Sequence, residues 1–112
     1  MAAAREKLKL VQGTAQLLIL RALTSGPRHG YGVSVWINER SGGELNVDDA
    51  ALYQALHRLE RRELIASEWG ISENNRRAKF YEITRQGRRF LTRETSTWRR
   101  YTRALTAVLE SS

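Results

Sequence analysis

The stretch of sequence that decides the fold runs from Asp48 to Thr84: DDAALYQALHRLERRELIASEWGISENNRRAKFYEIT. Apolar residues recur at helical spacing in its first part and alternate with polar residues in its last part, as they do in a strand. Between these parts lie a short strand-like segment and a basic loop, SENNRRAK. A helix followed by a basic hairpin is the outline of a winged helix-turn-helix. The stretch therefore predicts an α+β fold that is mainly helical with a small β-hairpin.

The helix predicted after Asp48 has two chemically different faces. Placed at about 100° per residue, one arc carries only apolar residues: Ala51, Leu52, Ala55, Leu56 and Leu59. The exposed arc and its edge carry Tyr53, Gln54, His57, Arg58 and Arg61. Arginine can donate two hydrogen bonds to guanine and glutamine can pair with adenine, while tyrosine and histidine can contact phosphates or bases. We expect this face to bind double-stranded DNA; the alternative is an ordinary solvated face.

The predicted hairpin supplies a second set of contacts. Residues 65–69 and 79–84 read as its two strands, joined by a loop over residues 70–78. The loop and its edge carry three basic side chains that can reach phosphates or a narrow minor groove: Arg76, Arg77 and Lys79. Asn74 and Asn75 suit a turn because asparagine tolerates left-handed backbone geometry. We expect the two asparagines to shape the loop and the basic residues to contact DNA.

The net charge of +7 is concentrated in one part of the chain. Residues 58–103 hold thirteen lysines and arginines against six glutamates, whereas the other residues hold six basic and six acidic side chains. An asymmetry of this kind favours a polyanionic partner. Charge by itself leaves open a basic surface that is merely solvated, so the argument depends on the helix and hairpin.

Two further helices are predicted before the deciding stretch. The first follows Thr14, a plausible N-cap, and ends before Pro27, which cannot continue the helical hydrogen bonds. Its apolar residues lie nearly all round, so it should be central to the core. The second runs from about Gly30 to Glu39 or Arg40. Residues 44–47 then form a linker or a short strand.

A long helix is predicted from Arg85 to Glu110, with a length of about 39 Å at the standard rise. Its apolar stripe comprises Phe90, Leu91, Trp98, Tyr101, Leu105 and Val108, continued by Leu109. The preceding domain is too small to cover a helix of this length, so the stripe needs a second surface. A second copy of the chain supplies one most simply, which predicts a homodimer. Trp98 either packs in the dimer seam or faces its copy across a two-fold axis, so that the two indoles sandwich a flat apolar ligand.

Several classes of function are disfavoured by composition. The chain has 112 residues, the size of one domain, and no cysteine, so disulfides and thiol chemistry are excluded. His29 and His57 have no further ligand at metal spacing, and no catalytic constellation is evident. We expect no enzyme activity, no cofactor and no metal. Charged residues near the start and the lack of a long apolar run predict no secretory leader and no membrane span, which favours the cytoplasm.

The sequence resembles the PadR family of transcriptional regulators over roughly residues 10–110. The matching segments are GTAQLLILRAL, GPRHGYGVSVWI, ALYQALHRLERRELI, EWGISENNRRAKFYEIT and GRRFL. The resemblance implies an N-terminal winged helix-turn-helix over residues 1–84, including an arm over 1–12, and a C-terminal dimerisation helix over 85–112. It implies a homodimer that binds a pseudo-palindromic operator, usually as a repressor, and that a small aromatic molecule can release from DNA.

By position, the resemblance puts Tyr53, His57 and Arg58 on the recognition helix and Arg76, Arg77 and Lys79 on the wing. The sequence departs from the family at Gln54, where proline is common, and at Ala51, where serine is common. Both positions lie near the start of the recognition helix, so they bear on operator sequence.

Two other functions remain open on the sequence. Winged helices also bind proteins, so the chain could be a protein-interaction module without sequence-specific DNA binding, although its basic bias would then require an acidic partner. An RNA-binding function is weaker, because the chain lacks the sheet of stacking aromatic residues that single-strand recognition uses.

Overall fold

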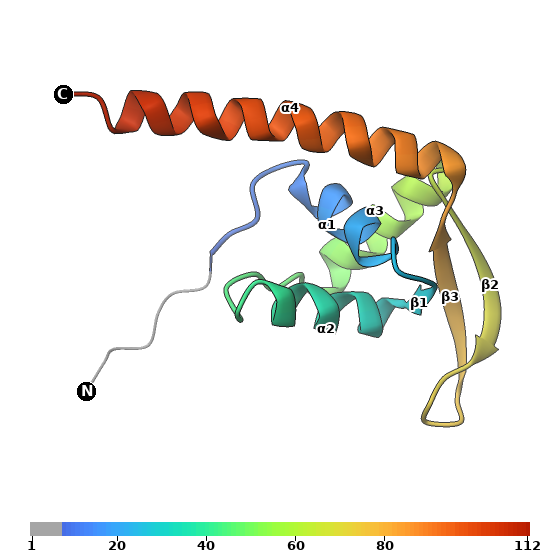
Figure 1. Cartoon of the computed structure of the whole chain (residues 1–112). Helices are drawn as coiled ribbons and strands as arrows, with labels where there is room; N and C mark the ends of the chain where they lie inside the picture. The colour runs from blue at the N-terminus through green and yellow to red at the C-terminus, as the bar shows by residue number, and fades with distance from the viewer. Residues whose placement is uncertain (1–7) are drawn as a thin grey trace, which may run out of the picture.

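Three helices and a small sheet form one body, and a fourth, long helix crosses it (Figure 1). The computed structural model describes residues 8–112; the first seven positions of the expected N-terminal arm lie outside the described residues. In chain order the elements are α1 (Thr14–Ala22), β1 (Arg28–His29), α2 (Gly30–Arg40), α3 (Asp49–Arg61), β2 (Ile65–Ile71), β3 (Arg77–Ile83) and α4 (Arg85–Leu109). The predicted α+β winged-helix architecture, with its long C-terminal helix, is confirmed.

The helix starts show why these segments become helical. The side chain of Asp48 accepts a hydrogen bond of 2.9 Å from the backbone N–H of Ala51 and so caps α3. Nδ1 of His29 accepts one of 3.0 Å from the N–H of Gly32 and caps α2. The expected cap of α1 was wrong: Gly13 occupies that position with φ of 87°, a geometry that suits glycine. Thr14 is the first helical residue, and its hydroxyl donates back to the carbonyl of Val11.

The sheet has three antiparallel strands in the order β1-β3-β2. Sequence patterning missed β1, because a strand of two residues has no periodicity to detect. The β2–β3 register runs from Ile65 opposite Ile83 to Ile71 opposite Arg77, so the strands are longer and the loop is shorter than expected. Asn75 has φ of 59° in the turn, as the expectation of a turn-forming asparagine requires.

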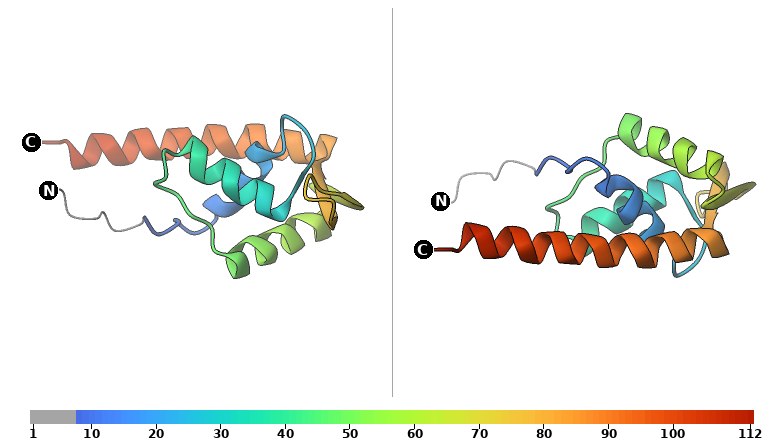
Figure 2. Two further views of the ribbon diagram at one scale, coloured as in Figure 1. Left: turned by 90° about the horizontal axis from the view of Figure 1, so that it is seen from below. Right: turned by 90° about the horizontal axis from the view of Figure 1, so that it is seen from above.

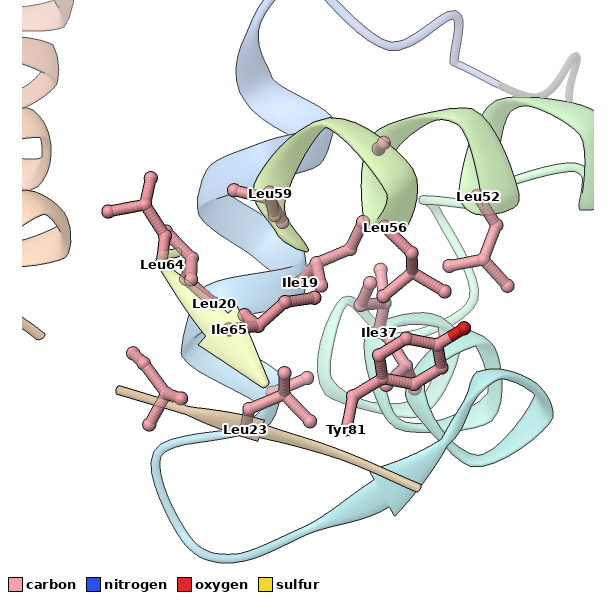
Figure 3. Packing of buried hydrophobic residues seen from close by; sticks show 14 of the residues in the cluster. Ile19, Leu20, Leu23, Ile37, Leu52, Leu56, Leu59, Leu64, Ile65 and Tyr81 are labelled. Carbon is pink, nitrogen blue, oxygen red and sulfur yellow. The ribbon is translucent and has the colours of Figure 1, made fainter. Parts of the chain in front are cut away.

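The core lies between α1, α2, α3 and the face of the sheet that carries Ile65, Tyr81 and Ile83. Leu52, Leu56 and Leu59 of α3 are each at most 1% exposed, and Figure 3 shows them directed toward residues of α1, α2 and β3. The apolar arc predicted for α3 is therefore its buried face. Burying the apolar arc of α3 turns the opposite arc of the same helix outward.

Helix α4 is fixed to the sheet at its beginning and extends beyond the body at its end (Figure 1). The hydroxyl of Thr84 accepts from the N–H of Gly87 at 3.0 Å and donates to the carbonyl of Glu63 at 2.8 Å. A Cβ on Gly87 would lie 2.0 Å from the carbonyl oxygen of Leu64, so α4 crosses the start of β2 without room for a side chain. Figure 2 shows α3 and α4 on opposite sides of the molecule.

Candidate nucleic-acid interface

The outer face of α3 is the first part of the candidate interface. All five predicted DNA-contacting residues of this helix are exposed: Tyr53, Gln54, His57, Arg58 and Arg61. They lie opposite the buried leucines, so the packing of the core determines which way they point. The helix has 13 residues and an unobstructed polar face, which suits insertion into a major groove.

A side-chain network holds the hairpin (β2 and β3 with their connecting turn) against α3. The hydroxyl of Ser67 on β2 donates a hydrogen bond of 2.5 Å to Glu60 Oε2 on α3. Nζ of Lys79 on β3 lies 3.5 Å from Glu60 Oε1. The hydrogen bond from Ser67, and then the charge and hydrogen bond of Lys79, lower the pKa of the Glu60 carboxyl despite its partial burial. One carboxylate therefore ties together the last turn of α3 and both strands.

The three predicted wing contacts differ in their surroundings. Arg76 and Arg77 are exposed at the end of the hairpin. The Arg77 guanidinium lies 4.7 Å from the ring centroid of Trp69, which holds this long side chain in one region. Lys79 is less exposed and its ammonium is engaged by Glu60, with the ring of Tyr81 5.6 Å away. Arg76 and Arg77 thus have more freedom than Lys79 to meet a phosphate.

A groove of about 530 Å³ separates the hairpin from the starts of α2 and α3. Its lining includes Tyr31 of α2, Tyr53 of α3, and Trp69 with the two wing arginines. Tyr31, Tyr53 and Trp69 are 73%, 50% and 59% exposed, which is high for large aromatic side chains. Sequence reasoning missed Tyr31 and Trp69, because an aromatic residue in a predicted helix or strand usually packs inside. The HGYG glycines around Tyr31 were the available signal.

Close packing at the base of this groove fixes the position of Tyr53. A Cβ built on Gly30 would lie 2.7 Å from the Tyr53 hydroxyl oxygen, so the phenol rests against the bare backbone at the start of α2. At the hairpin end of the groove, Nε2 of His29 lies 3.6 Å from a carboxylate oxygen of Glu73. The ring of His29 also packs edge-on against Phe80, with centroids 5.4 Å apart. These contacts link the turn of the hairpin to the body.

The predicted dimerisation stripe on α4 divides into two parts. Phe90 and Leu91 are half-buried against the core of the same chain. Tyr101, Leu105 and Val108 are 56%, 43% and 72% exposed on the projecting part of the helix. Among residues 8–112, Leu105 and Val108 do not pack against the core, and with Tyr101 they form an apolar strip along the projecting part of the helix.

A second cavity, of about 400 Å³, lies between the start of α1 and the middle of α4. Trp98 lines it, half-buried, and its ring centroid is 5.6 Å from that of Tyr101. Leu17 and Phe90 add apolar walls, and Glu94 is the charged residue among the lining side chains. The cavity brings the predicted effector residue together with parts of the chain that the sequence alone does not bring near it.

Within residues 8–112, no group of three histidine, cysteine, aspartate or glutamate side chains is placed to hold a metal ion. None of the helices in this described part is long and apolar enough to cross a membrane.

Comparison with known proteins agrees with this geometry. Residues 19–93 match the PadR-like family of transcriptional regulators, which is about two thirds of the chain and includes both α3 and the hairpin. The chain belongs to the PadR-like family. A transcriptional regulator from Clostridium thermocellum has a similar structure, with a TM-score of 0.77 and 26% identity, over 85% of this chain and 92% of that one.

Two further structures show how the fold recurs among PadR proteins. A PadR family transcription regulator from Clostridium difficile matches with a TM-score of 0.75 and 27% identity, over 87% of this chain and 99% of that one. PadR from Bacillus subtilis in complex with operator DNA matches at 0.66 and 21% identity, over 76% of this chain and 47% of that one, and so shares the fold. The proteins in these comparisons are transcriptional regulators, not enzymes. This PadR-like protein thus has the DNA-binding winged-helix fold.

Proposed function

We propose that this PadR-like protein is a homodimeric, sequence-specific DNA-binding regulator that represses transcription from a promoter with a pseudo-palindromic site. In this proposal α3 enters the major groove with Tyr53, Gln54, His57, Arg58 and Arg61, and the hairpin meets the flanking backbone or minor groove with Arg76 and Arg77. Lys79 serves mainly through the position of the hairpin, because Glu60 engages its ammonium. We propose that the protein acts in the cytoplasm.

The observation that carries the proposal is the outer face of α3. Its five polar and basic side chains are all exposed, although the opposite face of the same helix is almost completely buried. A basic hairpin is tied to the last turn of that helix through Glu60. The excess of basic over acidic residues follows the middle of α3, and PadR of B. subtilis, which has the same fold, forms a complex with operator DNA. Together these features favour duplex DNA over other polyanions.

The test is fluorescence anisotropy of the protein on the duplex upstream of its own gene, at two salt concentrations and with a scrambled competitor. We expect tight binding that resists the competitor and weakens with salt, because neutralised phosphates release counterions. Equal loss of binding to both duplexes would contradict sequence-specific recognition of that site. In that case, selection from a randomised duplex pool shows whether the protein recognises a different operator sequence or has no sequence preference.

The proposed dimer forms through α4. Trp98, Tyr101, Leu105 and Val108 continue one stripe from the cavity to the projecting end, with Phe90 and Leu91 at its beginning. Complete burial of a leucine- or valine-sized side chain is worth about 1.5–3 kcal/mol, and the partly exposed side chains of this strip would each contribute less, against the freedom lost on association. A two-fold pair would also place two α3 helices on one side of a duplex, as an inverted-repeat site requires.

Sedimentation at micromolar concentration tests the dimer. We expect Leu105→Glu to give the mass of a monomer, because a carboxylate in the seam would lose its hydration without gaining a partner. Ala107→Glu is the matched control, since Ala107 is also exposed but lies on the opposite side of the helix. A monomeric mass for the unchanged protein, or equal masses for the two variants, would contradict the proposed seam.

The proposed effector is a small flat aromatic molecule held beside Trp98. The indole and the ring of Tyr101 are close enough to stack on it, and the cavity of about 400 Å³ falls within the usual size of ligand sites. Glu94 is the charged lining residue, so a neutral or cationic molecule fits better than an anionic one. Tryptophan fluorescence with matched cationic, neutral and anionic aromatic compounds tests this. Quenching that persists in Trp98→Phe would place the bound molecule elsewhere.

The alternative function is a protein-interaction module without sequence-specific DNA binding. The projecting part of α4 favours it, because an apolar strip can dock on a different chain as well as on a second copy. A stable complex with one acidic protein, together with no preference among duplexes in the randomised pool, would replace the DNA-binding proposal.

A further inference from the structure

We propose that the groove between the hairpin and the starts of α2 and α3 seats the sugar–phosphate backbone of one DNA strand, with Tyr31 and Trp69 as contact residues. The inference rests on the proposed DNA-binding function and deepens it, because it names the part of the partner that this groove takes. Neither residue lies on the recognition-helix face or at the end of the hairpin.

The side of the hairpin that faces α3 also faces the groove. Ser67 of β2 reaches Glu60 of α3, and Trp69 shares the strand face of Ser67 two residues farther on. On β3, Lys79 and Arg77 share the face of the buried Tyr81. Trp69 and Arg77 are therefore on the α3 side of the hairpin, as their common place in the groove lining confirms.

The geometry of duplex DNA supplies the occupant. The adjacent major and minor grooves of B-DNA are separated by one sugar–phosphate strand. If α3 lies in the major groove and the hairpin reaches the neighbouring minor groove, that strand must pass between the two elements. The space between them is this groove of about 530 Å³.

The chemistry of the lining suits a sugar–phosphate strand. The phenol hydroxyls of Tyr31 and Tyr53 can donate to phosphate oxygens, and the faces of Tyr31 and Trp69 can pack on deoxyribose. The Arg77 guanidinium, held 4.7 Å from the Trp69 centroid, offers a paired donor to phosphate. Tyr31, Tyr53 and Trp69 are each at least half exposed in the free protein. A DNA strand in the groove would cover these three aromatic side chains, which accounts for their exposure in the absence of DNA.

One acidic residue lines the same groove and would oppose a phosphate. Glu73 is largely exposed, with a side-chain exposure of 77%, and its carboxylate lies 3.6 Å from Nε2 of His29. Arg76 and Arg77 outnumber this single carboxylate in the lining, so the groove has a cationic excess even though Glu60 engages Lys79.

The experiment combines protein variants with single methylphosphonate substitutions in the best duplex from a randomised pool. We expect the dissociation constant of the unchanged protein to rise about tenfold when the phosphate between the major-groove contact and the flanking minor groove is neutralised. Tyr31→Phe should weaken binding to the unmodified duplex by a similar factor. On the duplex neutralised at that phosphate, Tyr31→Phe should weaken binding no further, because its partner is already lost.

Trp69→Ala and Arg77→Met complete the test, with Arg40→Met as the matched control. Arg40 also stacks on a tryptophan, 5.2 Å from the ring centroid of Trp36, but lies outside the groove lining. We expect both groove variants to lose affinity and Arg40→Met to bind like the unchanged protein. Folding of each variant is checked by its thermal transition.

The possible outcomes separate the groove from the function itself. Tight, selective binding by the unchanged protein, with Tyr31→Phe and Trp69→Ala also unaffected, overturns the groove proposal and leaves the proposed function intact. Additive losses from Tyr31→Phe and the methylphosphonate overturn the assignment of Tyr31 to that phosphate. If the unchanged protein prefers no duplex in the pool, the proposed function fails and the groove proposal fails with it.

Discussion

Glu60 engages Lys79 at 3.5 Å and Ser67 at 2.5 Å, and this arrangement leads to a quantitative prediction about salt dependence. A lysine that neutralises a phosphate contributes about 0.9 to the slope of log affinity against log salt. Over a fourfold change in salt, one such contact amounts to roughly a 3.5-fold change in affinity. A lysine that is already paired with a carboxylate contributes less.

Three variants separate these two roles of Lys79. Arg77→Met should reduce the slope by about 0.9, the value of one phosphate contact, because Arg77 is exposed and forms no ion pair with a carboxylate within residues 8–112. Lys79→Met should leave the slope close to that of the unchanged protein. Glu60→Gln should increase the steepness of the slope by up to about 0.9, the value of one phosphate contact, because the substitution removes the negative charge that engages Lys79. The side-chain carbonyl of the glutamine can still accept the hydrogen bond from Ser67.

The assay is fluorescence anisotropy on one selected duplex across 50–200 mM salt, about the range in which such slopes are measured. The stability cost of Glu60→Gln should stay near 1 kcal/mol or below, since both partners are about a third exposed. The double variant Glu60→Gln with Lys79→Met provides the decisive control. If it keeps the steeper slope, the gain comes from losing an acidic residue near DNA and not from releasing Lys79. A Lys79→Met slope as flat as that of Arg77→Met would refute the reasoning outright.

Two other predictions concern stability. The folded-state pKa of Glu60 lies below its ordinary value, so the ionised carboxylate contributes to folding stability above about pH 4.5, and this contribution is lost as the pH falls through the lowered value. The melting temperature of Glu60→Gln should therefore differ most from that of the unchanged protein near neutral pH. A difference in melting temperature that widens on acidification would contradict this. Gly87→Ala should destabilise the fold by about 3 kcal/mol in urea unfolding, since its Cβ would lie 2.0 Å from the Leu64 carbonyl oxygen. Gly32→Ala is the matched control, because its nearest neighbour would lie 3.4 Å away and helical alanine is favoured over glycine; equal losses in the two variants would rule out the close contact as the cause.

The sequence by itself determined the elements whose pattern is long enough to be read. Helix α3 has apolar residues at helical spacing from Ala51 to Leu59, so its buried arc and its exposed arc were both predicted from spacing. On the hairpin strand, alternation placed Tyr81 and Ile83 on one face and Phe80 on the other, and the structure buries Tyr81 and Ile83 in the core. Local chemistry was readable as well: Asp48 caps a helix and Asn75 turns a hairpin because their own side chains favour those geometries.

Only the tertiary structure decided the features that depend on distant residues. Strand β1 exists because Arg28 and His29 meet Tyr81 and Phe80, more than fifty positions away. Lys79 differs from Arg77 because Glu60, nineteen positions earlier, comes within 3.5 Å of it. Tyr31 and Trp69 remain exposed because three separate elements open a groove at their junction. Sequence spacing encodes which face of one element is apolar, but only folding determines which side chains from different elements become neighbours.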